Sequence, residues 1–376
     1  MGKDFTCEQI FYTDISSVGT GISDAPTEIP LSDAPSRARR LVKDGDTILS
    51  TVRPNRRSFL YLKEPEKNRV VSTGFAVLRA GDKIDSRFLY YLVSNQPFTD
   101  YLTLHAKGAA YPAIDEDIIA NVDVVLPDLN DQKQIAGVLS AYDDLIENNT
   151  KRIKILEQIA QAIYREWFVY FRFPDHGKVK MIDSKTEFGK IPEGWKIGKL
   201  SDLAKITMGQ SPSSDFYNEI GEGSPFHQGV TNFEFRFPTT TTFSTEGARK
   251  ADEEDILFSV RAPVGRINVA DRNIIIGRGL AAVKSISGNQ SYLLYDFKHI
   301  FQTEDLIGGG AIFASVTKDD LNNFPVVIPD TKVIEQFESN VQPIDQLILN
   351  ISHELSVLRN SRDLLLPKLV SGEIQV

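Results

Sequence analysis

Apolar residues recur alternately four and three positions apart along two stretches of the sequence, a spacing typical of long helices that pack against other helices. The first stretch runs from Ile135 to Trp167 and the second from Phe337 to Leu369. Two matched helices with a narrow apolar seam most simply pack against each other, and a duplicated chain favours an antiparallel coiled coil. The residues that we predict in this seam are Ile135, Leu139, Tyr142, Ile146, Ile153, Leu156, Ile163, Phe337, Val341, Ile348, Leu355, Leu358 and Leu365.

Three residues interrupt the apolar pattern of these helices. Asn149 and Arg362 occupy seam positions, where a buried polar residue would fix the register of the two helices. Alternatively, each of them lies at the edge of the seam and reaches water. Pro343 has no backbone N–H, so it either kinks the second helix or marks its true start.

Outside these helices, short β-branched and aliphatic runs are separated by glycines and prolines, a pattern typical of strands. Helices are expected at Ser86–Asn95 and Ser291–Phe301. Four blocks occur twice in the same order, namely 48–53 with 256–261, 73–77 with 278–283, 108–114 with 310–316, and 124–128 with 326–330. Such an ordered recurrence indicates duplication. The sequence therefore predicts two globular α+β units related by a pseudo-twofold internal repeat, each followed by a long helix.

These patterns divide the chain into five segments. We predict a first globular domain at 1–130, a central helix at 131–170, a linker at 171–190, a second globular domain at 191–331 and a C-terminal helix at 332–376. The second domain opens with a segment, Ile191 to Asn218, that has no counterpart before Phe11. The first domain therefore lacks its opening segment. Either that segment is missing from the sequence, or another part of the fold completes the domain.

The net charge of −9 argues against a simple nucleic-acid binder, whose binding domain is usually basic. One basic patch nevertheless exists, because Ser36 to Ser58 contains seven basic and two acidic residues. This patch either contacts a nucleic acid or forms a solvated loop. A single cysteine, Cys7, allows no intrachain disulfide, and neither a signal peptide nor a membrane-spanning apolar run is evident. We therefore expect a cytoplasmic protein.

The motifs of common active sites are missing from the sequence. The five histidines are scattered without metal-ligand spacing, and we find neither a phosphate-binding loop nor a Gly-x-Ser-x-Gly nucleophile motif. The Asn-Pro-Pro-aromatic signature of adenine methyltransferases is also missing. We therefore predict a protein with no catalytic residue and no metal site.

Three phrases of the sequence are similar to those of a known family. They are IPEGWK at 191–196, KLSDLAKITMGQSP at 199–212 and LLPKLVSGEI at 365–374. Together with the alternation of globular units and long helices, they resemble the specificity subunits of type I restriction-modification systems. The resemblance covers nearly the whole chain. It departs from the family at the first domain, which lacks the opening phrase.

The resemblance implies a non-catalytic subunit that recognises double-stranded DNA. In the family, each globular unit is a target-recognition domain for one half of a bipartite site. The paired helices serve as a spacer and as the dock for two modification (methyltransferase) subunits. The implied cofactors lie on partners: S-adenosylmethionine on the modification subunits, and ATP and Mg on a restriction (translocase-nuclease) subunit. This chain is then expected to bind no cofactor itself.

Candidate DNA contacts follow from the side chains that read base edges, Arg or Lys toward guanine and Asn or Gln toward adenine. In the first domain the candidates are Arg53, Asn55, Arg56, Arg57, Lys107 and Tyr111, and in the second they are Gln228, Asn232, Arg261, Arg266 and Arg278. Arg53 and Arg261 are equivalent in the repeat, so they suit a phosphate contact or a role in the fold. An aromatic such as Tyr111 is more often part of a core than a stacking platform.

Two other functions are compatible with parts of this pattern. In the first, the helices form a coiled-coil scaffold and the duplicated domains bind protein without recognising DNA. In the second, the chain is an enzyme such as a fused restriction-methyltransferase fragment, against which the missing methyltransferase motifs weigh heavily.

Overall fold

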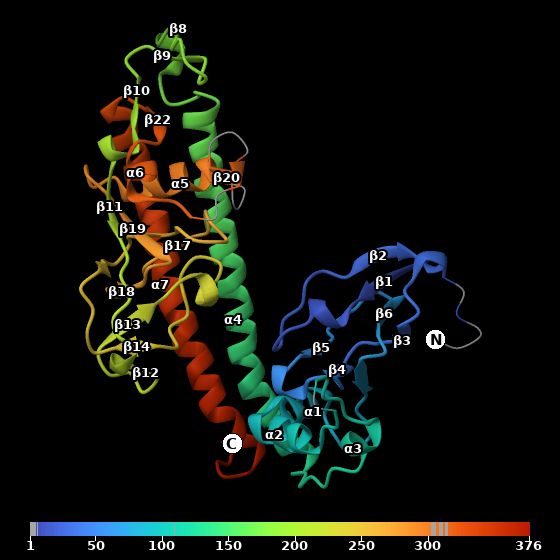
Figure 1. Ribbon diagram of the computed structural model, residues 1–376. Helices are drawn as coiled ribbons and strands as arrows, with labels where there is room; N and C mark the ends of the chain where they lie inside the picture. Colours follow the sequence, from blue (N-terminus) through green and yellow to red (C-terminus); the bar gives the residue numbers. More distant parts are fainter. Residues whose placement is uncertain (1–4, 6, 109, 302–305, 308–310, 313–314) are drawn as a thin grey trace. The chain divides into compact units, whose positions relative to one another are not determined.

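The computed structural model describes residues 5, 7–108, 110–301, 306–307, 311–312 and 315–376. Part of the predicted repeat block 310–316 lies outside these residues. The chain divides into two compact units: the first comprises Met1–Asn148 and Leu355–Val376, and the second Asn149–Glu354. Two long helices, α4 (Leu129–Tyr164) and α7 (Thr331–Val370), each contribute to both units (Figure 1). No helix in the described part of the chain is long and apolar enough to cross a membrane.

The first unit contains two sheets and three short helices. One sheet has the order β2-β1-β6-β3, and the other has the order β5-β4-β7. Asp85 and Asn95 cap the first two helices by accepting hydrogen bonds from backbone N–H groups of the first turn. The elements are β1 (Gln9–Thr13), β2 (Thr27–Pro30), β3 (Ala38–Leu41), β4 (Thr47–Ser50), β5 (Phe59–Tyr61), β6 (Arg69–Ser72), β7 (Phe75–Leu78), α1 (Ser86–Ser94), α2 (Gln96–His105) and α3 (Glu116–Ala120), with 3-10 turns η1 (Ile15–Ser17), η2 (Leu31–Asp33) and η3 (Pro54–Arg56).

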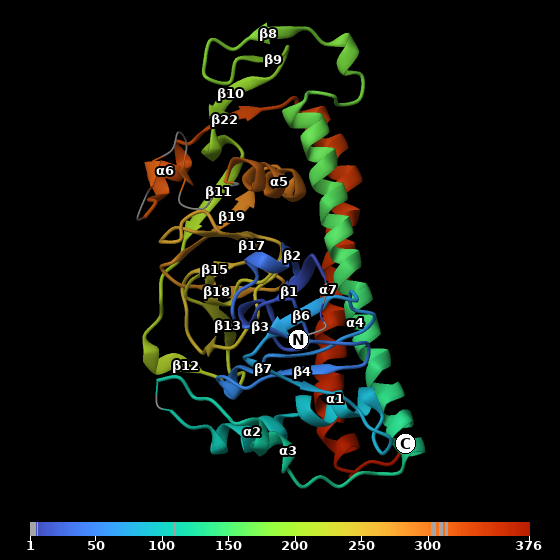
Figure 2. The same cartoon turned by 90° about the vertical axis from the view of Figure 1, so that its right-hand side faces the viewer.

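The second unit is built around sheets of the order β11-β19-β16-β17 and β12-β14-β13-β18-β15, with β10 paired to β22 (Figure 2). Its elements are β8 (Met181–Asp183), β9 (Lys190–Pro192), β10 (Lys196–Lys199), β11 (Ala204–Met208), β12 (Tyr217–Asn218), β13 (Ser224–His227), β14 (Phe243–Ser244), β15 (Lys250–Ala251), β16 (Ile256–Ser259), β17 (Ile267–Val269), β18 (Ile274–Ile276), β19 (Leu280–Ser285), β20 (Leu306–Ile307), β21 (Ala311–Ile312), β22 (Pro325–Ile328), α5 (Gln290–Ile300) and α6 (Lys318–Asn322). Its short turns are the π-helical η4 (Arg165–Val169) and the 3-10 turns η5 (His176–Lys178), η6 (Leu200–Asp202), η7 (Ser214–Phe216) and η8 (Val230–Asn232).

The strands β1 to β7 of the first unit have counterparts among the strands of the second unit, which confirms the predicted α+β repeat. β1 pairs antiparallel with β2 and parallel with β6, and β13 has the same two relations to β14 and β18. The hairpin β4-β5 with β7 corresponds likewise to β16-β17 with β19. The predicted helices at Ser86–Asn95 and Ser291–Phe301 match α1 and α5 to within a residue at each end. The segment β10-η6-β11 has no counterpart among the described residues of the first unit.

The two long helices pack antiparallel within each unit. In the first unit Leu139 of α4 shares a core with Leu366 and Leu369 of α7, and in the second Tyr164 shares a core with Phe337. Every residue predicted in the seam is at least partly buried. The buried ones are Ile135, Leu139, Ile153, Phe337, Val341, Ile348 and Leu355, and the half-buried ones are Tyr142, Ile146, Leu156, Ile163, Leu358 and Leu365.

The residues that interrupt the seam behave differently from one another. Arg362 Nη1 lies 2.8 Å from Asp143 Oδ1 on α4, so it forms an ion pair between the helices and favours one register. Asn149 is buried and its Oδ1 accepts a hydrogen bond from Arg152 of its own helix. α7 begins at Thr331, well before Pro343, so that proline does not mark the start of the helix.

Candidate nucleic-acid interface

Two loops of the first unit are joined by backbone hydrogen bonds. Arg53 N donates to Pro112 O at 2.7 Å, and Ile114 N donates to Thr51 O at 2.8 Å. These bonds bring the loop after β4, which carries Arg53 to Arg57, against the glycine-containing loop that carries Lys107 and Tyr111. Residues more than 50 positions apart in the sequence therefore form one continuous surface.

Five of the six contact residues predicted in the first unit have side chains on this surface. Asn55 and Arg56 are exposed and make no side-chain hydrogen bond to the described residues. The Lys107 ammonium lies 3.4 Å from Asp115, but both side chains are largely exposed, so this ion pair is weak. Tyr111 is 57% exposed rather than part of a core, and the Arg53 guanidinium lies 4.8 Å from its ring centre. This cation–π contact orients both side chains at the surface.

Arg57 has a different role from its neighbours. Its Nη2 donates to Ser94 O at 2.7 Å and its Nη1 donates to Gln96 Oε1 at 2.9 Å, at the junction of α1 and α2. The guanidinium also lies 5.7 Å from the ring centre of Phe59. A side chain held by these contacts is engaged in the fold, and the assignment of Arg57 as a DNA contact stays a prediction.

The basic patch predicted between Ser36 and Ser58 is partly neutralised by pairing. Arg37 Nη2 lies 2.8 Å from Asp14 Oδ2, and Arg40 contacts Glu116. Lys43 is exposed without such a partner among the described residues. The positive charge that remains available is therefore smaller than the composition suggests.

In the second unit a glycine loop between β18 and β19 packs closely against two other loops. Ser211 Oγ donates to Gln228 Oε1 at 2.7 Å and accepts from Arg278 N at 3.3 Å. Gly279 N donates to Gln228 O at 3.1 Å. A Cβ at Gly277 would lie 2.7 Å from Gln228 Oε1, so a side chain there would displace the Gln228 amide. This arrangement fixes Gln228 beside Arg278, and both residues are exposed.

Arg261 reaches the same region, because Val260 N donates to Gly279 O at 2.9 Å. Arg261 and Arg266 are both exposed, whereas Asn232 is half-buried and donates to Thr241 Oγ1 at 2.9 Å. The structure thus brings Gln228, Arg261 and Arg278 together. No contact among the described residues joins Asn232 to them.

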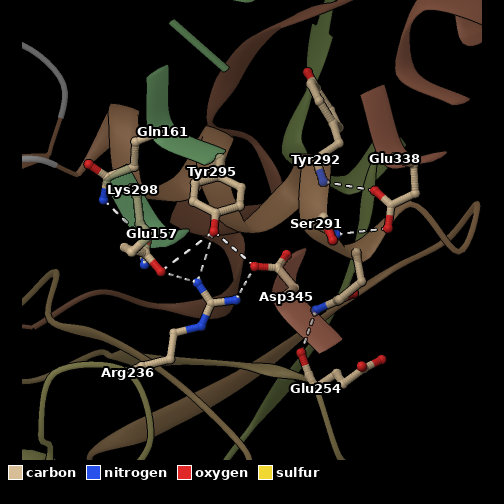
Figure 3. Close-up of polar contacts among 11 residues, drawn as sticks. Glu157, Gln161, Arg236, Glu254, Ser291, Tyr292, Tyr295, Lys298, Glu338 and Asp345 are labelled. Atoms are coloured by element: carbon tan, nitrogen blue, oxygen red, sulfur yellow. Dashed lines mark hydrogen bonds and ion pairs between the residues drawn. The ribbon is translucent and has the colours of Figure 1, made fainter. Parts of the chain in front are cut away.

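A buried polar cluster attaches a loop and the helix α5 of the second unit to the long helices (Figure 3). Arg236, only 5% exposed, donates to Glu157 Oε2 of α4 and Asp345 Oδ1 of α7, each at 2.6 Å. Tyr295 Oη of α5 donates to the same Asp345 oxygen at 2.8 Å, and Lys298 contacts Glu157. One arginine therefore links α4, α7 and α5 to the loop before β14.

The charges within this cluster determine its protonation. Burial alone would raise the pKa of Glu157, but Arg236 and Lys298 lower it below its usual value. Burial and the nearby Arg236 lower the pKa of Lys298 to about 8, although Glu157 opposes this. At neutral pH both partners are charged, so the cluster is a network of ion pairs.

A second carboxylate, on α7, fixes the start of α5. Glu338 accepts hydrogen bonds from Ser291 N at 3.1 Å and Tyr292 N at 3.0 Å (Figure 3). These N–H groups have no partner within the helix, and a carboxylate near a helix N-terminus is favourable. In the first unit, Tyr91 of α1 similarly donates to Asp143 of α4 at 2.6 Å. Each unit is thus tied to the long helices through polar contacts that are at least partly buried.

Sequence reasoning missed Ser211 and the Arg236 cluster. Ser211 lies within the phrase TMGQSP that carries the family resemblance, so its place in the sequence was available as a signal. Arg236, Glu157 and Asp345 belong to no periodic pattern, and only the folded chain brings them together. Among the described residues no group of three His, Cys, Asp or Glu side chains is placed to hold a metal ion.

Comparison with known proteins identifies a family. The "Type I restriction modification DNA specificity domain" matches the chain twice, at residues 18–158 and 192–355. A putative type I restriction enzyme MjaX specificity subunit of Methanocaldococcus jannaschii is 33% identical over 300 residues, which span 78% of this chain and 69% of that protein. The type I restriction enzyme HindI specificity subunit of Haemophilus influenzae is 26% identical over 412 residues, 92% of this chain and 90% of that one. The type I S subunit structure from M. genitalium shares the fold, with a TM-score of 0.53 at 15% identity over 96% of this chain and 88% of that one.

Proposed function

This chain belongs to the DNA specificity family of type I restriction-modification systems, and we propose that it directs such a complex to a bipartite DNA site without a catalytic step of its own. The duplication carries this proposal, because the specificity domain matches twice and the strands of the two units correspond. Two similar recognition units suit a site with two half-sequences. The same duplication favours DNA recognition over a coiled-coil scaffold without it.

We propose that the loop surfaces described above contact the DNA. In the first unit the contacts are Asn55, Arg56 and Lys107, with Arg53 held against Tyr111. In the second unit they are Gln228, Arg261 and Arg278, with Arg266 nearby. Exposed arginines suit guanine or phosphate, and Asn55 and Gln228 suit adenine. Because the whole chain carries a charge of −9, further phosphate contacts are proposed on partner subunits.

The partners that we propose are two modification subunits, which dock on the long helices, and a restriction subunit. Several large apolar side chains on these helices are exposed, among them Leu145, Ile155 and Ile159 of α4 and Val357 and Leu364 of α7. Ile155 and Ile159 are four residues apart on one face of α4, and Val357 and Leu364 are seven apart on one face of α7, so each helix presents an apolar stripe that suits a protein interface. In this proposal S-adenosylmethionine, ATP and Mg bind to the partners, and the complex works in the cytoplasm.

Methylome sequencing tests the proposal. A host that expresses the modification subunits is sequenced with and without this chain. We expect an adenine-methylated bipartite sequence only when the chain is present. Methylation that is the same in both hosts would contradict a specificity function. Calorimetry of the isolated chain with S-adenosylmethionine tests the cofactor assignment, and stoichiometric binding would overturn it.

A further inference from the structure

The loop after β11 lies directly against the glycine loop between β18 and β19. Gly209 N donates to Leu280 O at 2.9 Å, and a Cβ at Gly209 would collide with Gly277 O. This close approach places the side chain of Ser211 beside that of Gln228, which follows β13. The contact between these two side chains bears on which base Gln228 accepts.

The hydroxyl of Ser211 determines which end of the Gln228 amide faces outward. A serine hydroxyl has one proton to donate and two lone pairs. Ser211 Oγ accepts from Arg278 N at 3.3 Å, and its own proton points to the end of the Gln228 amide that lies 2.7 Å away. That proton needs an oxygen, so the end held by Ser211 is the carbonyl Oε1. The amino Nε2 is then the end that is left for a ligand.

The carbonyl end of Gln228 also lies against the backbone. A Cβ at Gly277 would lie 2.7 Å from Oε1, so the glycine leaves just enough room for this end of the amide. Gln228 itself is exposed, and its Nε2 makes no hydrogen bond to the described residues. Gln228 therefore keeps its acceptor on the protein and presents its N–H donors outward.

The four bases answer an outward donor differently in the major groove. Adenine offers N7 as an acceptor, guanine offers N7 and O6, and thymine offers O4, whereas cytosine offers only the donor of its N4 amino group. An outward Nε2 of Gln228 can bond to the first three bases but not to cytosine. A reversed amide would turn Oε1 outward, and Oε1 would accept from cytosine N4.

We propose that Ser211 is a positioning residue, which makes Gln228 exclude cytosine at one base pair of the half-site that the second unit reads. This inference rests on the proposed function, in which Gln228 faces DNA. The two ends of a glutamine amide are nearly equal in size, so packing alone does not select one orientation. The hydrogen bond from Ser211 makes that selection.

Binding of the assembled complex to pools of DNA duplexes tests this role. The methylated sequence is identified first, and each of its positions is then randomised in turn and the bound duplexes are sequenced. Ser211→Ala should increase the binding of duplexes with cytosine at one position by about tenfold, with the other positions unchanged. Ser213→Ala is the matched control, because this hydroxyl of the same loop donates to Asp215 Oδ2 at 3.1 Å rather than to Gln228. It should change no position.

A second variant, Gln228→Glu, separates positioning from support of the loop. Both oxygens of its carboxylate are acceptors, so Ser211 no longer has two different ends to select between. Gln228→Glu should turn the preference at the same position toward cytosine, whose N4 donates to a carboxylate. Adding Ser211→Ala to this variant should leave that preference as it is. A serine that only supported the loop would change the preference in both backgrounds.

Three results would overturn the proposal. The first is an exclusion of cytosine that persists in Ser211→Ala. The second is an equal change on adding Ser211→Ala to the native chain and to Gln228→Glu, or the same change in Ser213→Ala. The third is a Gln228→Glu variant that alters no position, because Gln228 would then read no base. None of these results contradicts the proposed function, which fails, and this role of Ser211 with it, if the native complex selects no bipartite sequence.

Discussion

Two neighbouring arginines in the loop after β4 have different roles, one at the surface and one in the fold. Only their contacts distinguish them. The Arg57 guanidinium is held by Ser94 and Gln96, whereas Arg56 is exposed one residue earlier. Sequence reasoning identified the loop because its arginines follow a β-branched run. It could not sort the arginines, because the partners of Arg57 lie some 40 residues away on another element.

The two arginines therefore give opposite predictions. Arg56→Ala should weaken DNA binding by the assembled complex and reduce its salt slope by about one unit, with unchanged thermal stability, because one phosphate contact is lost. If Arg56 reads guanine instead, the variant should lose about 1–3 kcal/mol of binding free energy, and the loss should be confined to one half-site. Arg57→Ala should lower the unfolding temperature of the isolated chain. The salt dependence of DNA binding and the unfolding temperature are measured for both variants. The same change in both quantities for Arg56→Ala and Arg57→Ala would refute their different roles.

Asp296 gives a prediction for pH. Burial raises the pKa of this α5 carboxyl to about 6, although the Tyr164 hydroxyl, which donates to it at 2.6 Å, opposes the shift. The folded pKa lies above the usual value near 3.8, so the folded state binds this proton more tightly and loses stability as pH rises from about 4 to 6. Asp296→Asn removes this loss. As pH rises across that interval, the free energy of unfolding of the variant should increase by about 2–3 kcal/mol relative to that of the native chain. Urea unfolding at several pH values measures the difference, and a difference independent of pH would contradict the assignment.

At the scale of elements, the long helices were predictable because their apolar spacing is local and repeated. The strand repeat was predictable for the same reason, since its four blocks keep their order. The attachment of each unit to the helices was not, because it depends on single polar residues such as Arg236 and Asp143 whose partners are distant in sequence.

The buried seam of α4 gives a prediction with a matched control on the same helix. Leu139 is fully buried, whereas Leu145 is 48% exposed. Leu139→Ala should destabilise the chain by about 2–5 kcal/mol, because it leaves a cavity in the core shared with α7. Leu145→Ala should change stability by less than about 0.5 kcal/mol. Denaturant unfolding compares the two, and equal losses would mean that the helix face was misassigned.

The Arg236 cluster gives a second prediction at this scale. Arg236→Met leaves the buried carboxylates of Glu157 and Asp345 without their shared partner, so it should cost about 3–5 kcal/mol. Arg272→Met is the control, because Arg272 pairs with Asp271 at the surface and is 55% exposed. Its removal should cost less than about 1 kcal/mol. Chemical denaturation measures the loss in unfolding free energy for both variants. A loss for Arg236→Met as small as that for Arg272→Met would show that the cluster does not stabilise the attachment of the second unit to the helices.

The whole molecule contains two recognition units and one pair of long helices, so we propose that helix length sets the gap between half-sites. Because Asp143 pairs with Arg362 and Tyr164 packs near Phe337, matched insertion points are after Asn148 in α4 and after Glu354 in α7. One heptad in each helix adds about 10 Å, or about three base pairs of DNA. The methylated half-sites should keep their sequences while the gap grows. An unchanged gap in an active complex would exclude this role of the helices.

In the proposed function, each unit reads one half of a bipartite site. The most direct measurement is methylome sequencing of a host that expresses the modification subunits with a chimera, in which residues 192–330 are replaced by the matching segment of a relative that confers a different methylated sequence. We expect one half-site to change to that of the relative, while the other half-site stays as it is with the native chain. Methylation in which both half-sites change, or neither does, in an active complex would contradict the claim.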